Sequence, residues 1–241
     1  MQHLLNELRN EMQMLKIKAS LQDGAAQIRN SRIWLPNFPM DVIQRVIIMS
    51  NNYWDMSGLE IINKHLVEDA VIVDIGANIG SHSLYWAIEC NASKIYAFEP
   101  LPAMFEVLEK NIDLNNLHGR VIPHNFGLLD VETNAEIHHY DPNNIGATAF
   151  RPSETGPFKL KTLDSLKIPE KVDLIKIDAK DAEVEIIYGA FELIKRDKPV
   201  IVLESYNRRQ QVDRVLSAIG YSLAETIREN EDFIYKYSEF M

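Results

Sequence analysis

Short apolar runs alternate with stretches of helical periodicity over most of this chain. The runs carry Val, Ile and Leu on neighbouring positions, which is typical of strands covered on both faces of a parallel sheet. They predict strands at residues 71–73, 94–99, 121–127, 172–178 and 198–204. Apolar residues every three or four positions predict helices at residues 58–65, 81–89, 103–114, 182–194 and 208–220. This alternation predicts an α/β fold with a doubly wound parallel sheet, closed by two antiparallel strands at residues 221–225 and 232–237.

The first 52 residues follow a different pattern. From residue 1 to about residue 30, apolar positions three or four apart predict an amphipathic helix, with Leu5, Leu8, Met12, Leu15 and Ala19 on its apolar face. Such a helix either lies on its own domain or pairs with a second copy in a homodimer. Beyond two prolines, residues 41–49 are compatible with a helix or a strand. We therefore expect a helical extension and connector at 1–52 and a main domain at 53–241.

A glycine loop follows the first strand of the main domain. Asp74 ends that strand, glycines allow a tight turn, and a serine is a candidate N-cap for the next helix, as Ser57 is for the preceding one. Backbone amides at such a junction bind ligands. The third glycine of a dinucleotide loop is absent, which disfavours a nicotinamide cofactor. The acid and Asn78 suit a ligand with a cation and a polar tail, and the loop resembles motif I of S-adenosylmethionine-dependent methyltransferases. The expected cofactor-binding residues here are Asp74, Gly76, Ala77, Asn78, Gly80 and Ser81.

Three further strands end in residues that extend this site, because the carboxyl ends of parallel strands meet at one edge of the sheet. Glu99, followed by Pro100, ends the second strand and is placed to accept hydrogen bonds from both hydroxyls of a ribose. Asn125 and Phe126 at the end of the third strand would lie near an adenine ring. Asp178 ends the fourth strand, beside the first.

An inserted β-hairpin is predicted between the third and fourth strands. Residues 135–140 and 158–162 have the alternating pattern of short strands and bracket a loop rich in Pro, Asn and Gly at 141–146. We expect the hairpin to overhang the site. His138 and His139 are adjacent, so in a strand they point to opposite faces, and we interpret them as ordinary strand residues rather than joint metal ligands.

Composition narrows the class of protein. The chain has 241 residues, 46% of them hydrophobic and 25% charged, a mean hydropathy of −0.18 and no long apolar run, which argues against a membrane-spanning helix. A net charge of −10 and the lack of a Lys/Arg stripe argue against a nucleic-acid partner. Cys90 is the single cysteine, so no internal disulfide is possible. The first residues lack a secretory signal pattern, and the expected location is cytoplasmic.

Several stretches together resemble the FkbM-type methyltransferases. They are Val73–Gly80, Ala97–Pro100, Thr162–Leu166 and Asp173–Asp178, with Ala182–Glu183, and Asn144–Thr148 resembles a further family segment. The resemblance implies a seven-stranded Rossmann-like methyltransferase sheet at residues 53–241, S-adenosylmethionine as cofactor, and a hydroxyl on a sugar, glycan or natural product as acceptor. One departure stands out: Lys180 replaces a family acid and Asp181 a family glycine. Either the acceptor has changed or catalysis is lost, which leaves a methyltransferase-like binding or scaffold protein as the alternative.

The catalytic hypothesis centres on Asp178. Methyl transfer to oxygen requires a nucleophile held about 3 Å from the methyl group and a destination for the hydroxyl proton. We expect Asp178 to orient the methionine amine or the acceptor hydroxyl, with Asp181, His82 or His138 as further candidate bases. A metal-assisted version would use Asp178, Glu204 and Asn207 as oxygen ligands for Mg²⁺; the metal-free scheme is preferred.

Overall fold

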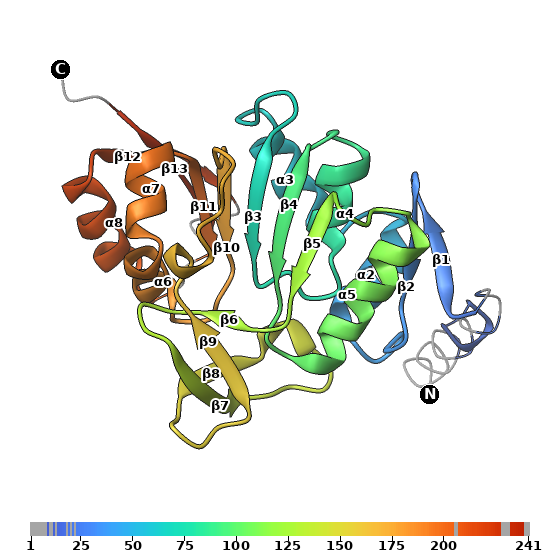
Figure 1. The fold of residues 1–241 in the computed structure, drawn as a ribbon. Helices are drawn as coiled ribbons and strands as arrows, with labels where there is room; N and C mark the ends of the chain where they lie inside the picture. Colours follow the sequence, from blue (N-terminus) through green and yellow to red (C-terminus); the bar gives the residue numbers. More distant parts are fainter. Residues whose placement is uncertain are drawn as a thin grey trace.

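A seven-stranded mixed sheet forms the centre of the protein (Figure 1). The computed structural model describes residues 9, 12, 14–17, 19, 21, 23–204, 207–227 and 232–238, and the statements below concern these residues. The strand order is β12-β13-β11-β10-β3-β4-β5, with the first five strands in chain order parallel and β13 and β12 antiparallel to their neighbours. This confirms the predicted α/β sheet. The strands are β3 (Val71–Ile75), β4 (Lys94–Phe98), β5 (Val121–His124), β10 (Leu174–Ile177), β11 (Val200–Glu204), β12 (Tyr221–Ile227) and β13 (Asp232–Tyr237).

Helices cover both faces of this sheet. Alternate strand residues explain the two layers: Ile72 belongs to a cluster with one set of helices, whereas Val71 and Val73 belong to a cluster with the other. The first set is α2 (Val42–Ser50), α3 (Met56–Asn63), α4 (Ser81–Ile88) and α5 (Pro102–Leu114), and the second is α6 (Glu183–Gly189), α7 (Phe191–Asp197) and α8 (Arg209–Ala218). Among the described residues no helix is long and apolar enough to cross a membrane.

The N-terminal helix ends earlier in the chain than predicted. Of the expected helix, residues 9, 12, 14–17 and 19 are helical, while Leu5 and Leu8 lie outside the described residues. The prediction is wrong for residues 25–28, which form β1 (Ala25–Ile28) and pair antiparallel with β2 (Ser31–Trp34). Asp23 and Gly24 both have positive φ, a conformation that cannot continue a right-handed helix, and the chain turns into the strand there. The predicted homodimer stays a prediction.

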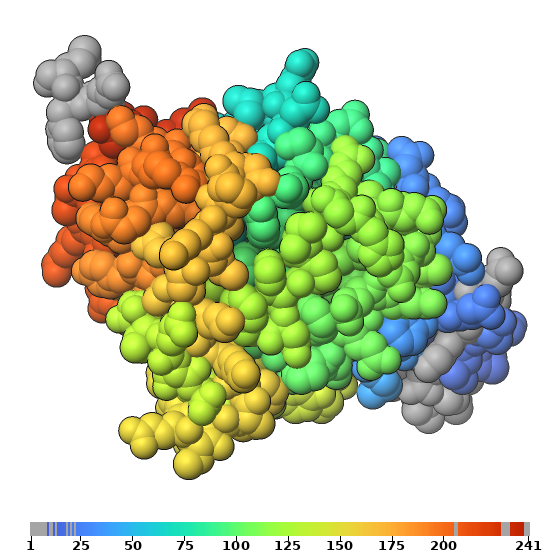
Figure 2. All heavy atoms as spheres, in the orientation of Figure 1, coloured from blue at the N-terminus to red at the C-terminus, as the bar shows by residue number. Residues whose placement is uncertain are grey.

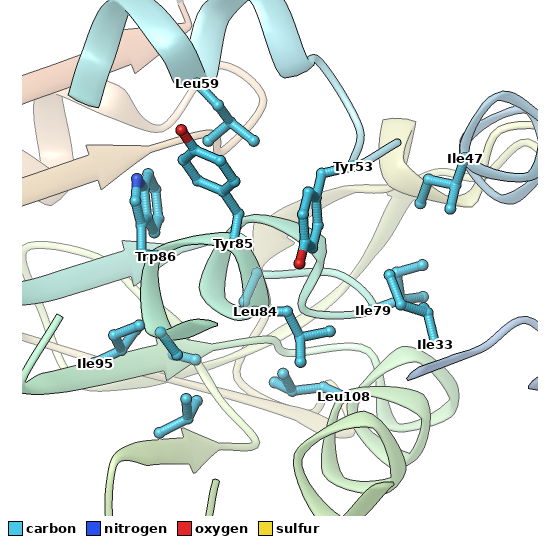
Figure 3. Packing of buried hydrophobic residues seen from close by; sticks show 14 of the residues in the cluster. Ile33, Ile47, Tyr53, Leu59, Ile79, Leu84, Tyr85, Trp86, Ile95 and Leu108 are labelled. Carbon is cyan, nitrogen blue, oxygen red and sulfur yellow. The ribbon is translucent and has the colours of Figure 1, made fainter. Parts of the chain in front are cut away.

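Residues 41–49, compatible with helix or strand in the sequence, lie in α2. Asp41 is its N-cap, and the Asp41 side chain accepts a hydrogen bond of 2.9 Å from the Gln44 amide. In Figure 3, Ile33 from β2 and Ile47 from α2 lie near Ile79 of the glycine loop. The described residues among the first 52 therefore share a hydrophobic core with the main sheet, while the domain division at residue 52 stays a prediction.

Two predicted helix boundaries were wrong. Asp55, not Ser57, caps α3: the Asp55 carboxylate accepts from the Gly58 amide, and the helix begins at Met56. The helix expected at 182–194 is two helices that meet at Ala190. A side chain at the preceding Gly189 would lie 1.9 Å from the Leu129 carbonyl oxygen, so the close approach of these two segments requires glycine, a poor helix former.

The inserted unit is a four-stranded sheet rather than a hairpin. Its strands are β6 (Gly127–Leu128), β7 (Thr133–His139), β8 (Ala149–Pro152) and β9 (Phe158–Lys161), in the order β6-β9-β7-β8. The predicted strands β7 and β9 do pair antiparallel, but β7 also pairs with β8, which lies between the two predicted strands and was not itself predicted. This small sheet lies below the main sheet in Figure 1, and its yellow and green atoms protrude at the lower left of Figure 2.

Candidate active site

A cavity of about 780 Å³ lies at the carboxyl ends of the parallel strands. Its wall contains residues that follow β3, β4, β10 and β11, and the inserted sheet contributes residues from its β7, its β8 and the loop between them. The short 3-10 helix η1 (Ile145–Ala147) belongs to this loop. The overhang expected from the sequence therefore lines a single cavity together with the main sheet.

The glycine loop forms one side of the cavity. Gly76 has a φ of +75°, and a Cβ there would lie 2.1 Å from the carbonyl oxygen of Asp178, so the loop and the end of β10 are in close contact. The amides of Gly76 and Ala77 donate to the Phe98 carbonyl at 3.0 and 2.9 Å. Of the predicted loop residues, Gly76, Ala77, Asn78 and Ser81 line the cavity, whereas Asp74 and Gly80 do not.

Ser81 is not the N-cap of α4. That position belongs to Gly80, and Ser81 is the first helical residue. The Ser81 hydroxyl oxygen instead accepts a hydrogen bond of 2.9 Å from the Trp54 amide. This bond fixes the segment before α3, including the cavity residue Trp54, against the start of α4.

Asp74 is fully buried beneath the loop. Its Oδ2 accepts from the Ser83 hydroxyl at 2.7 Å, and its Oδ1 lies 3.0 Å from Lys176 Nζ. Asp74 and Lys176 are paired positions on the neighbouring strands β3 and β10. Asp74 therefore forms buried contacts with Lys176 and Ser83 and is not part of the cavity wall.

Lys176 is a cavity residue that the sequence analysis missed. Its ammonium donates to the Gly76 carbonyl at 2.9 Å and lies 3.9 Å from Asp178 Oδ2. Burial opposes the charged form, but the carboxylates of Asp74 and Asp178 outweigh burial and raise the pKa of Lys176. The signal in the sequence is a lysine inside an otherwise apolar central strand, Leu174–Ile177.

Glu99 lies buried in the cavity wall beside the glycine loop. Its two carboxylate oxygens accept from the Asn78 amide at 2.9 Å and the Leu101 amide at 2.8 Å. Burial raises the pKa of Glu99 to about 7, although both amides and Lys176 favour the ionised form. Pro100 also lines the wall, as predicted for a site residue.

Asn125 and Phe126 do not line the cavity. The Asn125 side-chain amide donates to the Glu99 carbonyl at 2.9 Å, and the Phe126 ring packs against Phe98 and His124 at centroid distances of 5.6 and 5.3 Å. The wall at this point consists of Phe98, Gly127 and Leu128.

An ion-pair cluster forms the part of the wall at the ends of β10 and β11, next to the glycine loop. The Lys180 ammonium lies 2.8 Å from Asp178 Oδ1 and 2.8 Å from Glu204 Oε1, so it bridges the ends of β10 and β11. Burial disfavours charge on Asp178, but Lys176 and Lys180 outweigh burial and lower its pKa. Burial is likewise outweighed at Lys180, where the carboxylates of Asp178 and Glu204 raise the pKa. All three side chains of this bridge line the cavity.

The backbone conformation at residue 181 explains why an aspartate can stand in the position of the family glycine. Its φ is +63°, a left-handed value that glycine adopts freely and that Asp and Asn tolerate better than most residues. Arg208 holds this turn: it donates to the Asp181 carbonyl at 2.5 Å and forms two bonds, of 2.5 and 2.9 Å, with the Glu185 carboxylate. Arg208 and Asp181 both line the cavity.

The candidate bases differ in their surroundings. His82 lines the cavity with its Nε2 at 3.1 Å from the Trp54 carbonyl oxygen, and burial, aided by the charge of Lys176, lowers its pKa. His138 lines the cavity from the inserted sheet and is exposed. Glu204 lies in the Lys180 bridge, whereas Asn207 is not part of the wall. Over the described ranges, no three His, Cys, Asp or Glu side chains are grouped as a metal site.

The doubly wound sheet with its antiparallel end and the cavity at the strand ends define a Rossmann-like fold of the methyltransferase type. A family model described as the methyltransferase FkbM domain matches residues 74–235, and the chain belongs to this family. It is 29% identical over 175 residues to a hexuronic acid methyltransferase, AglP, of Haloferax volcanii, covering 69% of this chain and 70% of the relative. It is 27% identical to the methyltransferase sdnD of Sordaria araneosa, covering 66% of this chain and 76% of the relative.

Solved structures agree on the fold. An FkbM methyltransferase from Methylobacillus flagellatus matches with a TM-score of 0.51 and 19% identity, covering 71% of this chain and 44% of that one. A protein of the NADB-Rossmann superfamily from Streptococcus agalactiae matches with a TM-score of 0.52 and 13% identity, covering 76% of this chain and 68% of that one. At these identities the matches establish the architecture of the sheet.

Proposed function

We propose that this chain transfers a methyl group from S-adenosylmethionine to a hydroxyl of a sugar, glycan or natural-product acceptor. The observation that carries the proposal is the single cavity that the glycine loop, Glu99 and the Asp178 cluster line together. S-adenosylmethionine supplies an activated methyl group on a positively charged sulfur. Glu99 would hold its ribose hydroxyls, and Gly76, Ala77 and Asn78 would line its path along the loop.

The charges of the wall fit a cationic cofactor. Carboxylates outnumber basic side chains, which favours a bound positive charge. The wall carries six acids (Glu99, Asp130, Asp178, Asp181, Glu185 and Glu204) and four bases (Arg151, Lys176, Lys180 and Arg208). The same excess of carboxylates would repel the negatively charged pyrophosphate of a dinucleotide, so the proposal favours a sulfonium cofactor over a nicotinamide one.

Within this proposal, Asp178 orients the acceptor hydroxyl and His82 takes its proton. Two cations keep the Asp178 carboxylate ionised, which makes it a good hydrogen-bond acceptor but a weak base. Because the Trp54 carbonyl can only accept, His82 Nε2 carries the hydrogen of that bond and Nδ1 keeps a lone pair. The lowered pKa of His82 keeps the imidazole neutral near pH 7. The acceptor oxygen would form its new bond to the methyl carbon as the bond between that carbon and the cofactor sulfur breaks. The sulfur would leave as a neutral thioether, and the hydroxyl proton would pass to His82 Nδ1.

The acceptor class rests on the inserted sheet and on the relatives. Trp54, Asn144 and Thr148 line the cavity where an acceptor would enter, and such side chains stack on sugars and bond their hydroxyls. The Haloferax relative, by its name, methylates a hexuronic acid. The acids of the wall outnumber its bases, which disfavours nucleic acid as the acceptor. The alternative, a binding or scaffold protein, is motivated by Lys180 and Asp181.

Transfer of a labelled methyl group tests the proposal. Purified protein is incubated with methyl-labelled S-adenosylmethionine and a panel of neutral and acidic saccharides, and cofactor binding is measured by calorimetry in parallel. We expect binding and label transfer to at least one saccharide, with loss of transfer in His82→Gln. Binding without transfer to any acceptor supports the scaffold alternative, and absence of cofactor binding rejects both.

A further inference from the structure

The Lys180 bridge has the geometry of a cation site that is already filled. Two carboxylate oxygens, Asp178 Oδ1 and Glu204 Oε1, converge on one point from the ends of adjacent parallel strands. The ammonium nitrogen of Lys180 sits at that point, 2.8 Å from each oxygen. One or two carboxylates at a cavity wall are also how proteins hold Mg²⁺, at oxygen distances of about 2.1 Å.

We propose that Lys180 is a built-in cation, which takes the place of a divalent metal ion between Asp178 and Glu204 and makes the reaction of this chain metal-independent. Metal independence of the reaction rests on the proposed methyl transfer. The exclusion of a metal ion from the site depends only on the three side chains. In this role Lys180 is a positioning residue: it fixes Asp178 and Glu204 in the cavity wall and contributes the positive charge next to the acceptor.

The charges around the bridge support the replacement of a metal ion by Lys180. Three carboxylates (Asp74, Asp178 and Glu204) face the two ammonium groups of Lys176 and Lys180. With an acid at position 180, four carboxylates would face the one remaining ammonium group, a balance that attracts a divalent ion strongly. Lysine at this position reduces the excess of negative charge from three to one. The covalent attachment of the Lys180 ammonium group to the chain is a tether that also favours the lysine. Because Lys180 is only two residues from Asp178, a metal ion would have to displace a cation that cannot diffuse away.

The chain offers a matched control. Lys171 also lies two residues from its partner acid, with Nζ 3.2 Å from Asp173 Oδ1. This pair is on the surface, where the Lys171 side chain is 72% exposed, and it lies outside the cavity wall. Charge reversal at Lys171 therefore changes the net charge of the protein by the same amount as charge reversal at Lys180, without altering the bridge.

Mn²⁺ titration of the full chain, followed by electron paramagnetic resonance, tests the proposal without cofactor or acceptor. We expect no stoichiometric site in the wild type or in Lys171→Glu, and one Mn²⁺ per chain in Lys180→Glu, bound at least about tenfold tighter than by wild type. Adding Asp178→Asn to Lys180→Glu should abolish the site. Lys180→Ala, which leaves the two carboxylates without the tether, should bind Mn²⁺ more weakly than Lys180→Glu and should melt at a higher temperature when Mn²⁺ is present.

Three results would overturn the proposal. They are a stoichiometric Mn²⁺ site in the wild type, the absence of Mn²⁺ binding in both Lys180 variants while circular dichroism shows them folded, and loss of wild-type methyl transfer on chelation with EDTA. Failure of the proposed function has a different signature, because no labelled methyl would be transferred under any condition while the Mn²⁺ results would still be obtained.

Discussion

Gly76 allows the contact between the glycine loop and β10 to be tested by a single methyl group. A Cβ on Gly76 would lie 2.1 Å from the carbonyl oxygen of Asp178, which is backbone and cannot rotate away. Gly76→Ala must therefore separate the loop from the strand end. The left-handed φ of +75° costs alanine about 1 kcal/mol, and the forced displacement adds about 1–3 kcal/mol.

Gly119→Ala separates these two costs. Gly119 has nearly the same φ, +78°, but nothing lies within 4 Å of its Cβ position. This variant should lose only the cost of the left-handed conformation. Gly76→Ala should be less stable than Gly119→Ala by about 1–3 kcal/mol, or by about 2–12 °C in Tm for a chain of this size. Urea titration and thermal melts followed by circular dichroism measure both variants, and equal losses would refute the close contact.

Three further predictions concern charge and conformation at the site. Asp178→Asn should lower the rate of labelled methyl transfer by about 100-fold or more and leave the Kd for S-adenosylmethionine nearly unchanged. A higher Kd would instead assign Asp178 to the cofactor amine, and an unchanged rate would remove Asp178 from the mechanism. Because burial raises the pKa of Glu99 to about 7, the native chain binds this proton more tightly than the unfolded chain. The contribution of Glu99 to the unfolding free energy should therefore fall by about 3 kcal/mol as pH rises from about 4.5 to 7. Chemical denaturation across this range should show a weaker dependence of the unfolding free energy on pH for Glu99→Gln than for wild type, and equal dependences would contradict the assignment. Asp181→Gly should change stability by less than about 0.5 kcal/mol, while Asp181→Val should lose about 1–2 kcal/mol in urea titration, and equal stabilities would contradict the role of the left-handed φ.

The edge of the sheet that carries the site could be predicted from the sequence. Parallel strands that alternate with helices present their carboxyl ends on one edge, so Glu99 and Asp178 were expected on the same side of the molecule, and both line one cavity. The closing pair β12 and β13 was also predictable from alternation and from its position after the last helix.

What the sequence left open was the direction of individual side chains. Asp74 ends the predicted strand, yet its carboxylate lies inside the sheet because its neighbour on β10 is Lys176, a pairing that depends on strand register. The hairpin of β1 and β2 was missed because its apolar residues continue the spacing of the preceding helix, and only the backbone turn at Gly24 separates the two. Register and turn conformation are set by tertiary contacts, which a pattern along one chain does not contain.

The two departures from the family pattern now have separate physical accounts. Asp181 reproduces the left-handed backbone that glycine supplies, and its carbonyl is held by Arg208. Lys180 reverses a charge, but its ammonium group forms ion pairs with two carboxylates of the same wall. Neither residue fills the cavity or breaks the glycine loop, so the case for a scaffold protein rests on chemistry rather than on shape. Lys180→Met therefore gives a decisive comparison. An enzyme that uses the bridge to position Asp178 should lose methyl transfer while it keeps cofactor affinity, whereas a scaffold should show neither transfer before the substitution nor a change after it.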